Sequence, residues 1–257
     1  MKNRFEDFLA LHKNSEALLV ANVWNAQSAR IFEQKNVKAI ATSSQAVAET
    51  LGYADGEAMD IEEYMLIVKR IAASVSIPFS VDLEAGYGNT TEQICNNISR
   101  LYSMGVSGIN IEDSVVINGQ RTIVDAETFA QKLKSICDQL NSAGVKMFIN
   151  VRSDSFLLGL PNALDDALSR IDHYQHTGVH GLFFPCVTNI SDIEKITERS
   201  KLPVNVMCMP NLPNFEQLQN AGVKRISVGP FLNMNIYKGL ENSIEKIVTE
   251  GSFSSLF

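Results

Sequence analysis

Three acidic residues lie where two short apolar runs end, and their spacing suits the binding of a cation. Asp82 and Glu84 are two residues apart in VDLEAGYGN, and Glu112 closes the run GINIE. Alternate residues of a strand point to the same face, so Asp82 and Glu84 are expected to face the same way. Carboxylates that crowd together repel one another, and a hard divalent cation removes that repulsion. The pattern predicts a Mg2+ or Mn2+ site, although any one of these acids could instead cap a helix or pair with a lysine.

Arg152 and the pair Ser43 and Ser44 are the candidate groups for holding an anion. Arg152 follows the apolar run FINV, and its guanidinium offers two parallel donors to a carboxylate or a phosphate. The same arginine could instead pair with one of the acidic residues. Ser43 and Ser44 end the run AIAT, where hydroxyl and backbone N–H groups can hold a substrate oxygen.

A parallel sheet is the element that would position these candidates, because each follows a short run rich in β-forming residues. Most of the runs are continuously apolar, as strands buried on both faces are. Helical periodicity fills the segments between them, and Thr90 and Asp125 stand where helix N-caps are expected. The eight runs are LLVANV (18–23), AIATSS (39–44), FSVDLE (79–84), GINIED (108–113), MFINVR (147–152), GLFFPC (181–186), VNVMC (204–208) and RISVG (225–229).

Eight strands that alternate with helices predict an α/β fold, a (β/α)8 TIM barrel, as a single domain over residues 1–257. A doubly wound open sheet is the competing architecture, but the first run continues into NVWNAQSA without its glycine-rich turn. Active sites of the barrel fold lie at the carboxyl ends of the strands, where the candidates fall. The last segment, NIYKGLENSIEKIVTEG, is expected to be a terminal helix that packs on the barrel or on a neighbouring subunit.

The composition narrows the classes of partner. The chain has 257 residues, a net charge of −7 and a pI of about 5.2. An acidic chain without a basic patch argues against nucleic acid and against an anionic membrane surface. No apolar run approaches the roughly 20 residues that span a bilayer. The cysteines form no CxxC pair, which favours reduced thiols and a cytoplasmic location; they are Cys95, Cys137, Cys186 and Cys208.

Three of the histidines cluster in RIDHYQHTGVHG, with a spacing that resembles a metal site. His173, His176 and His180 precede the sixth run, however, which places them at the opposite end of the barrel from the acidic residues. We therefore interpret them as surface or packing residues.

Several motifs together resemble the isocitrate lyase / phosphoenolpyruvate mutase superfamily. The resemblance runs from NVWNAQSARIF through TSSQAVAETLGYADGE, PFSVDLEAGYGN, GINIEDS and INVRSD to NVMCMPN and KRISVGP. It implies that Asp82, Glu84 and Glu112 are metal-site acids and that Asp55, in LGYADGE, joins the water shell of the metal. Glu84 stands where the family pattern has a second aspartate.

The same resemblance implies the substrate contacts and the chemistry. Ser43 and Ser44 match the segment that binds the substrate carboxylate, and Arg152 matches the substrate arginine; Trp24, Phe184 and Asn205 are candidates for setting specificity. Arg152, Asp55 and Glu112 are the expected catalytic residues. Members bind a 2-oxo acid or its enolate on Mg2+, which stabilises the charge that develops as a C–C or P–C bond breaks. Members also form homodimers and homotetramers that exchange their last helix.

The loop after Glu112 departs from the family pattern. The lyases carry Lys-Lys-Cys-Gly-His there and the mutases carry a lysine and Asn-Ser, whereas this chain has SVVINGQRTIVDAETF. Asn118, Gln120 and Arg121 are its polar residues that could cover the site. We expect a lyase that breaks a C–C bond of a small 2-oxo or 2-hydroxy (di)carboxylate through a metal-stabilised enolate. The open alternatives are a P–C bond mutase or hydrolase and a non-catalytic 2-oxo acid binding relative.

Overall fold

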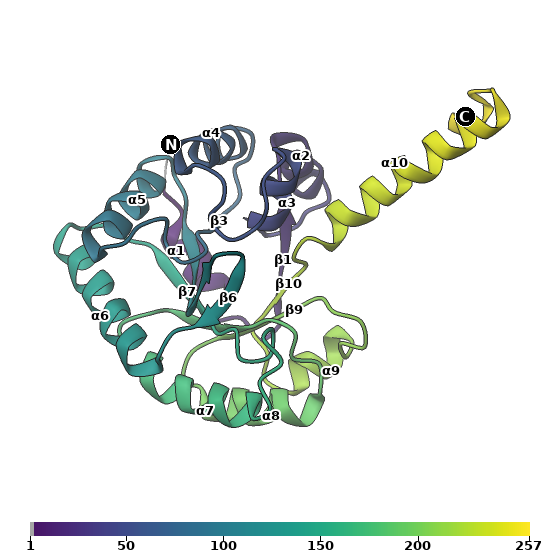
Figure 1. Ribbon diagram of the computed structural model, residues 1–257. Coiled ribbons are helices and arrows are strands. Elements are labelled where there is room, and N and C mark those ends of the chain that lie inside the picture. The colour runs from purple at the N-terminus through teal and green to yellow at the C-terminus, as the bar shows by residue number, and fades with distance from the viewer. Residues whose placement is uncertain (1–2) are drawn as a thin grey trace.

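The computed structural model describes residues 3–257, and in this part of the chain eight parallel strands close into a barrel (Figure 1). Their order around the barrel is β1-β10-β9-β8-β7-β4-β3-β2. Each predicted run contains one barrel strand, so the predicted (β/α)8 fold is confirmed. The strands are β1 (Leu18–Val23), β2 (Ala39–Thr42), β3 (Phe79–Asp82), β4 (Gly108–Glu112), β7 (Phe148–Arg152), β8 (Gly181–Phe184), β9 (Val204–Met207) and β10 (Arg225–Ser227).

Helices follow the strands and form the outer layer around the barrel (Figure 1). Thr90 caps α5 in a capping box with Gln93, and Asp125 caps α6 by accepting from the N–H of Thr128, as their positions in the sequence predicted. The helices of this layer are α2 (Ala26–Gln34), α3 (Ser44–Thr50), α4 (Ile61–Ala72), α5 (Thr91–Ser103), α6 (Ala126–Ser142), α7 (Ala163–Tyr174), α8 (Ile190–Arg199) and α9 (Phe215–Asn220).

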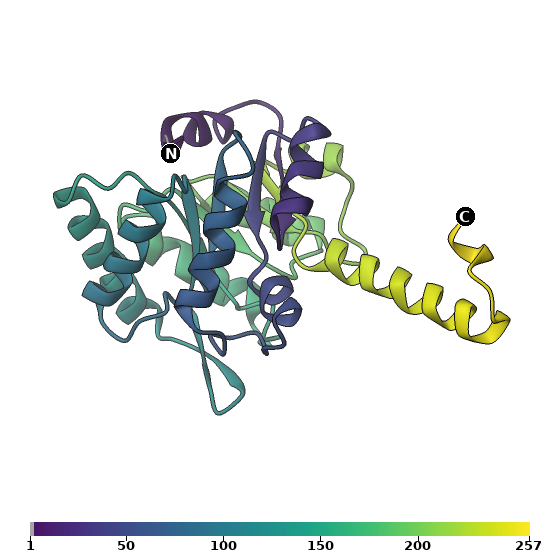
Figure 2. The ribbon, with the colours of Figure 1, turned by 90° about the horizontal axis from the view of Figure 1, so that it is seen from above.

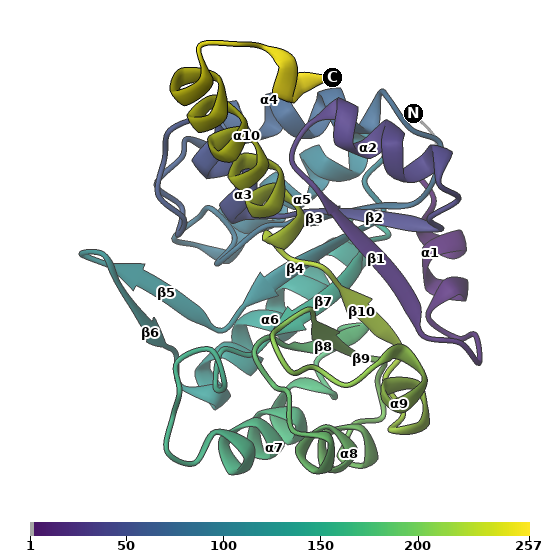
Figure 3. The ribbon, with the colours of Figure 1, turned by 90° about the vertical axis from the view of Figure 1, so that its right-hand side faces the viewer.

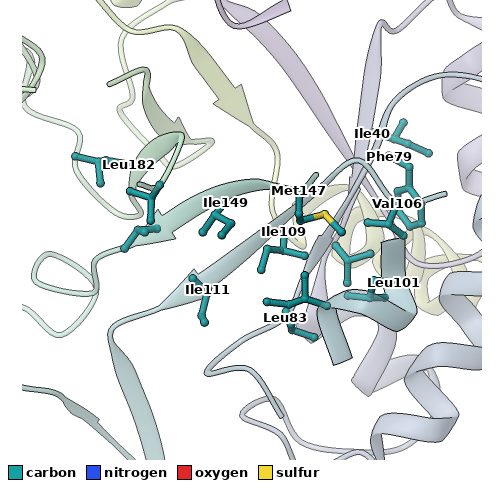
Figure 4. Packing of buried hydrophobic residues seen from close by; sticks show 14 of the residues in the cluster. Ile40, Phe79, Leu83, Leu101, Val106, Ile109, Ile111, Met147, Ile149 and Leu182 are labelled. Atoms are coloured by element: carbon teal, nitrogen blue, oxygen red, sulfur yellow. The ribbon is translucent and has the colours of Figure 1, made fainter. Parts of the chain in front are cut away.

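The main hydrophobic core lies between the strands and this helical layer. On β4, Ile109 and Ile111 belong to that core, together with Leu101 of α5 and Leu182 of β8 (Figure 4). The alternate residue Asn110 faces the barrel interior, where its Oδ1 accepts from Nδ2 of Asn150 at 2.9 Å. Strand alternation therefore separates an apolar outer face from a polar inner one.

Helix α1 (Phe5–Leu11) and the residues after it close the amino end of the barrel. Phe8 is fully buried against Leu18, Val20 and Phe148, and the ring of His12 stacks on that of Phe148 with 4.2 Å between centroids. Figure 2 shows α1 on the opposite side of the barrel from a two-stranded hairpin, β5 (Ser114–Ile117) and β6 (Gln120–Ile123). The sequence analysis did not predict this hairpin, which lies in the loop after Glu112.

The predicted terminal helix is α10 (Phe231–Glu250), which extends away from the barrel (Figures 1 and 2). It is followed by the short helix η1 (Ser254–Leu256) near the C-terminus (Figure 3). Leu240, Ile244 and Val248 of α10 are exposed. Within residues 3–257, no helix combines the length and the apolar character needed to cross a membrane.

Candidate active site

A cavity of about 580 Å³ opens at the carboxyl ends of the barrel strands. Five residues predicted for the site line this cavity, so the structure brings them together. They are Ser43, Ser44, Asp55, Asp82 and Arg152. The other polar lining residues are Asn22, Gln45, Asn110, Arg121, Cys186 and Ser227.

Asp82 and Asp55 approach each other across the hydroxyl of Ser44. Oγ of Ser44 lies 3.0 Å from Oδ2 of Asp82 and 3.2 Å from Oδ1 of Asp55. Asp82 ends β3, Asp55 lies in the loop after α3, and Ser44 begins α3. The only other side-chain partner recorded for Asp82 among residues 3–257 is Asn110, whose Nδ2 lies 3.4 Å from Oδ1. Asp82 thus faces the cavity with neutral hydrogen-bond partners.

Arg152 is held in place by two buried acids. Its Nε and Nη2 donate to Asp154 at 2.6 and 3.2 Å, and its Nη1 lies 2.9 Å from Oε2 of Glu112. Glu112 ends β4 beside Arg152 at the end of β7, because these two residues are partners in the strand register. Two of the five N–H groups of the guanidinium are therefore hydrogen-bonded, both to Asp154, while Nη1 pairs with Glu112 by charge without a hydrogen bond.

Arg121 reaches the same acids from the hairpin. It forms an ion pair with Oε1 of Glu112, and its Nη1 lies 3.3 Å from Oδ2 of Asp154. Its Nη2 lies 3.3 Å from Oδ2 of Asp55. The sequence analysis proposed that Arg121 could cover the site, and the structure places its side chain in the cavity wall. Asn118 and Gln120, proposed with it, are exposed at the hairpin tip.

Glu84 was expected to face the same way as Asp82, and the structure shows that it does not. Strand β3 ends at Asp82, and Glu84 has a left-handed φ of 50°, so strand alternation does not reach it. Its carboxylate accepts from the Tyr87 hydroxyl at 2.7 Å and from the Glu57 N–H at 2.8 Å. Glu84 is buried beside the cavity and does not line it. It therefore holds the loop after β3 in place instead of facing a ligand.

The three residues proposed to set specificity also lie away from the cavity surface. Trp24 and Phe184 belong to the hydrophobic core between the strands and helices. Asn205 is buried inside the barrel, where its Oδ1 accepts from Asn150 at 3.1 Å and its Nδ2 donates to Oγ of Ser227, which does line the cavity. Asn205 thus supports the cavity floor from below.

Asp154 is the site residue that the sequence analysis missed. It is fully buried, and its Oδ2 accepts from Oγ of Ser114 at 2.5 Å in addition to its contacts with Arg152 and Arg121. Its position two residues after Arg152, just beyond a strand end, was the available signal. Because a buried acid is stable only when it is paired, an aspartate so close to a strand-end arginine is a candidate partner.

Burial raises the pKa values of the acids at this end of the barrel. The pKa of Asp82 is raised by desolvation and by Asp55, while Arg152 opposes the shift. Desolvation also raises the pKa of Glu112, against the opposing charge of Arg152. For Glu84, desolvation followed by repulsion from Asp55 raises the pKa to about 8. Desolvation is the largest cause of each shift, and repulsion from Asp55 adds to it for Asp82 and Glu84.

The remaining candidates take no part in the cavity. His173 and His176 are exposed at the end of α7, and the His180 backbone N–H bonds Ile149 near the amino ends of the strands, so the interpretation of the three histidines as surface or packing residues is confirmed. Across residues 3–257, three or more His, Cys, Asp or Glu side chains nowhere converge closely enough to hold a metal ion by themselves.

Comparison with known proteins fits this geometry. The family model described as phosphoenolpyruvate phosphomutase matches residues 8–248. The chain belongs to this family. A solved Burkholderia cenocepacia structure, assigned as a phosphonomutase, is 34% identical, with a TM-score of 0.88 and coverage of 94% of this chain and 99% of that one.

Two of the curated proteins that are similar to this chain are lyases. Oxaloacetate decarboxylase of Rhodopseudomonas palustris is 26% identical over 84% of this chain and 75% of that protein. The 2-methylisocitrate lyase of Escherichia coli is 24% identical over 76% and 66%, respectively. The chain is therefore an enzyme of the isocitrate lyase / phosphoenolpyruvate mutase superfamily, whose members cleave C–C bonds or rearrange P–C bonds.

Proposed function

We propose that the protein is a Mg2+-dependent lyase that breaks a C–C bond of a small 2-oxo or 2-hydroxy (di)carboxylate. The observation that carries this proposal is Asp82, a carboxylate in the cavity wall with neutral hydrogen-bond partners and a second carboxylate, Asp55, close by. Repulsion between them is relieved when a cation binds. The family membership supports the class of reaction.

The donor set fits Mg2+ or Mn2+. Mg2+ takes oxygen ligands and usually keeps several waters, so one or two carboxylates suffice to bind it. Asp82 would hold the ion directly and Asp55 would accept hydrogen bonds from its waters. Glu112, which was also predicted to be a metal-site acid, does not line the cavity and pairs with Arg121 and Arg152. This arrangement needs no convergence of three protein ligands. When bound, the ion would polarise the 2-oxygen of the substrate and offset the charge that develops there.

The substrate carboxylate would lie between Arg152 and the start of α3. Ser43, Ser44 and Gln45 line the cavity there, and hydroxyl and backbone N–H groups can donate to a carboxylate oxygen. On the other side, Arg152 lines the cavity, and its Nη1 group donates no hydrogen bond to the residues that the structure describes. Asp154 and Glu112 fix the plane of the Arg152 guanidinium, so little conformational entropy is lost when the substrate binds.

The hairpin limits the reactions that the site can perform. Among the residues that the structure describes, the hairpin contributes Arg121 to the lining of the cavity. An arginine keeps its proton at every relevant pH, so it cannot act as a base. Decarboxylation of a 3-carboxy-2-oxo acid suits such a site. The C–C electron pair moves into the enolate as CO2 leaves, and the enolate then takes one proton from water. No protein base is required before the bond breaks.

A P–C bond reaction is the second candidate, favoured by the 34% identical structure assigned as a phosphonomutase. It would require a cation near the transferring phosphoryl group, for which the hairpin offers Arg121. Phosphorus NMR of phosphonopyruvate incubated with enzyme and Mg2+ separates the two. A C–C lyase leaves the P–C resonance unchanged, whereas a mutase or hydrolase converts it.

A screen of 2-oxo and 2-hydroxy acids with Mg2+, assayed for pyruvate, glyoxylate and CO2, tests the main proposal. We expect Mg2+-dependent release of one of these products and its loss when EDTA is added. Mg2+-dependent binding across the panel without any product would instead support the non-catalytic alternative.

We also infer that α10 packs on a second copy of the chain and that the protein is a homodimer or homotetramer. An apolar stripe along a helix that extends from its own barrel is typical of an interface. Exchange of α10 between subunits would bury this stripe.

A further inference from the structure

The backbone N–H and C=O of Asp82 are bonded by two side chains, because the sheet pairing on that side has already ended. Asp82 is the last residue of β3, whereas the pairing of β3 with β2 ends at Ser80 and Ala41. The Asp82 N–H donates to Oγ1 of Thr42 at 2.8 Å, and its C=O accepts from the Tyr64 hydroxyl at 2.8 Å. Thr42 ends β2 and Tyr64 lies in α4, so both elements hold the end of β3 through a hydroxyl group.

These groups form a closed ring of three hydrogen bonds. Oγ1 of Thr42 lies 2.6 Å from the hydroxyl oxygen of Tyr64. Tyr64 uses its only hydroxyl proton toward the Asp82 C=O, so the proton between the two hydroxyls comes from Thr42. The Asp82 N–H therefore donates to Thr42, Thr42 donates to Tyr64, and Tyr64 donates back to Asp82. Each hydroxyl donates one hydrogen bond of the ring and accepts another.

Both hydroxyl-bearing residues are buried. Thr42 is 0% exposed and Tyr64 is 1% exposed. Removal of either hydroxyl would leave a buried backbone group of Asp82 without its partner, which costs more than the loss of a hydrogen bond at the surface. The ring therefore holds the end of β3 more firmly than a solvated contact would.

The carboxylate of Asp82 has weaker support of its own. Its oxygens lie 3.0 Å from Oγ of Ser44 and 3.4 Å from Nδ2 of Asn110, and both donors are neutral. The strand ends at Asp82, and Glu84, two residues later, has a left-handed φ of 50°. The direction of the Asp82 side chain consequently depends on its backbone, which the ring fixes.

We propose that Thr42 and Tyr64 are positioning residues for the binding of a divalent cation, because their hydroxyls fix the backbone of Asp82 and so aim its carboxylate into the cavity. The inference rests on the proposed function for the role of Asp82. It adds two residues that do not line the cavity and act only through Asp82. A ligand that is held in place before the cation arrives loses less freedom when the cation binds, which raises the affinity.

The Mg2+ affinity of variants, measured by calorimetry without substrate, tests this role. Tyr64→Phe and Thr42→Val each remove one hydroxyl and keep most of the side chain. Each should weaken Mg2+ binding by about tenfold or more, as is typical when a residue that orients a metal ligand is lost. Thr42→Ser keeps the hydroxyl and should bind Mg2+ as the wild type does.

Thr177→Val is the matched control for Thr42→Val. Thr177 is also buried, and its hydroxyl donates to the backbone C=O of Tyr174 at 2.7 Å, outside the cavity lining. Both valine variants should lower the free energy of unfolding in urea without divalent cations. Thr42→Val alone should also lose Mg2+ affinity, whereas a purely structural role of Thr42 would leave the affinity of both folded variants unchanged.

The outcomes separate this inference from the proposed function. Wild-type Mg2+ affinity in folded Tyr64→Phe and Thr42→Val overturns the inference and leaves a metal site at Asp82 in place. Failure of the wild type to bind Mg2+ overturns both. If circular dichroism shows that Tyr64→Phe does not fold, Thr42→Val is compared with Thr42→Ser. Equal affinities of these two overturn the inference, and weaker binding by the valine variant supports it.

Discussion

Glu112 lies between two guanidinium groups, and this placement links the hairpin to the active site. Arg152 contacts it from β7 and Arg121 from β6, and Asp154 shares both arginines. The side chain of Glu112 is 2% exposed, so its charge depends on these partners. Removal of one partner leaves an incompletely paired acid in a desolvated site.

Arg121→Gln should therefore lower stability more than the loss of a surface ion pair does. We expect the free energy of unfolding to fall by about 2 kcal/mol, since Arg121 is itself largely buried. Urea denaturation without divalent cations measures this change. Arg199→Gln, which removes an exposed pair with Asp172, is the control and should cost less than about 1 kcal/mol. Equal losses in the two variants would show that Arg121 is not part of a buried network.

At the residue scale, the sequence predicted the site residues that end or directly follow a barrel strand, because the strand fixes the direction of their side chains. Asp82, Ser44 and Arg152 end or follow barrel strands and line the cavity as expected. Glu84 could not be placed, because the strand stops two residues earlier and a left-handed turn reverses the direction of its side chain. Asp154 becomes conspicuous only when its contacts with two arginines are seen.

At the element scale, the hairpin β5–β6 packs against the loop that carries Asp55. Gly56 has a φ of 99°, and a Cβ at this position would lie 2.6 Å from Cγ2 of Val116 in β5. The close approach allows Arg121 to reach Asp55. The signal for the hairpin was present in the sequence, because Asn-Gly between two β-forming runs favours a two-residue turn. Asn118 and Gly119 both have positive φ angles, as this turn requires.

Gly56→Ala should displace the hairpin. Amide hydrogen exchange in residues 114–123 should become faster, because the new methyl group collides with Val116. Gly52→Ala is a matched control, since Gly52 has a similar φ of 85° and open space around the same position. Both variants carry backbone strain of about 1 kcal/mol. Unchanged exchange in the hairpin of Gly56→Ala would contradict the proposed packing.

The packing of α1 and His12 at the amino end of the barrel makes the stability of the fold sensitive to acid. His12 is buried, and desolvation, followed by the charge of Arg225, lowers its pKa from 6.5 to about 3. Between these values the unfolded chain binds the proton and the folded protein does not, so stability falls as the pH drops through this window. The contribution of His12 should decrease by about 2 kcal/mol between pH 7 and pH 5.

His12→Phe should remove this contribution while keeping a ring against Phe148. Urea denaturation of both proteins at pH 7 and pH 5 measures the difference. The wild type should lose about 2 kcal/mol more than the variant. Parallel losses would mean that His12 is protonated in the folded protein at pH 5. The sequence could not predict this effect, because the burial of His12 depends on α1 covering the barrel.

At the scale of the whole molecule, the barrel was predictable because its eight strands carry continuous apolar runs and its helices carry clear caps. The place of α10 was not, since an apolar stripe on a helix predicts burial without naming the surface that buries it. In this structure Leu240 is 60% exposed. A surface on another copy of the chain would bury such residues.

Leu240→Glu combined with Ile244→Glu should therefore dissociate the oligomer. Light scattering after gel filtration should give the mass of a dimer or tetramer for the wild type and that of a monomer for the variant. Asn242→Glu adds charge to the same helix outside the stripe and should leave the mass unchanged. A monomeric wild type would refute the inferred assembly.

The most direct test of the account is turnover of Asp82→Ala at saturating Mg2+, measured on the 2-oxo or 2-hydroxy acid that the wild type cleaves, beside calorimetric titration with Mg2+. Asp138→Ala, at an exposed acid of α6, is the control. The account predicts that Asp82→Ala loses both Mg2+ binding and product release, by at least a hundredfold, while Asp138→Ala keeps both. Wild-type turnover by Asp82→Ala, or Mg2+ binding of unchanged affinity, would contradict a metal-dependent active site at the carboxyl end of β3.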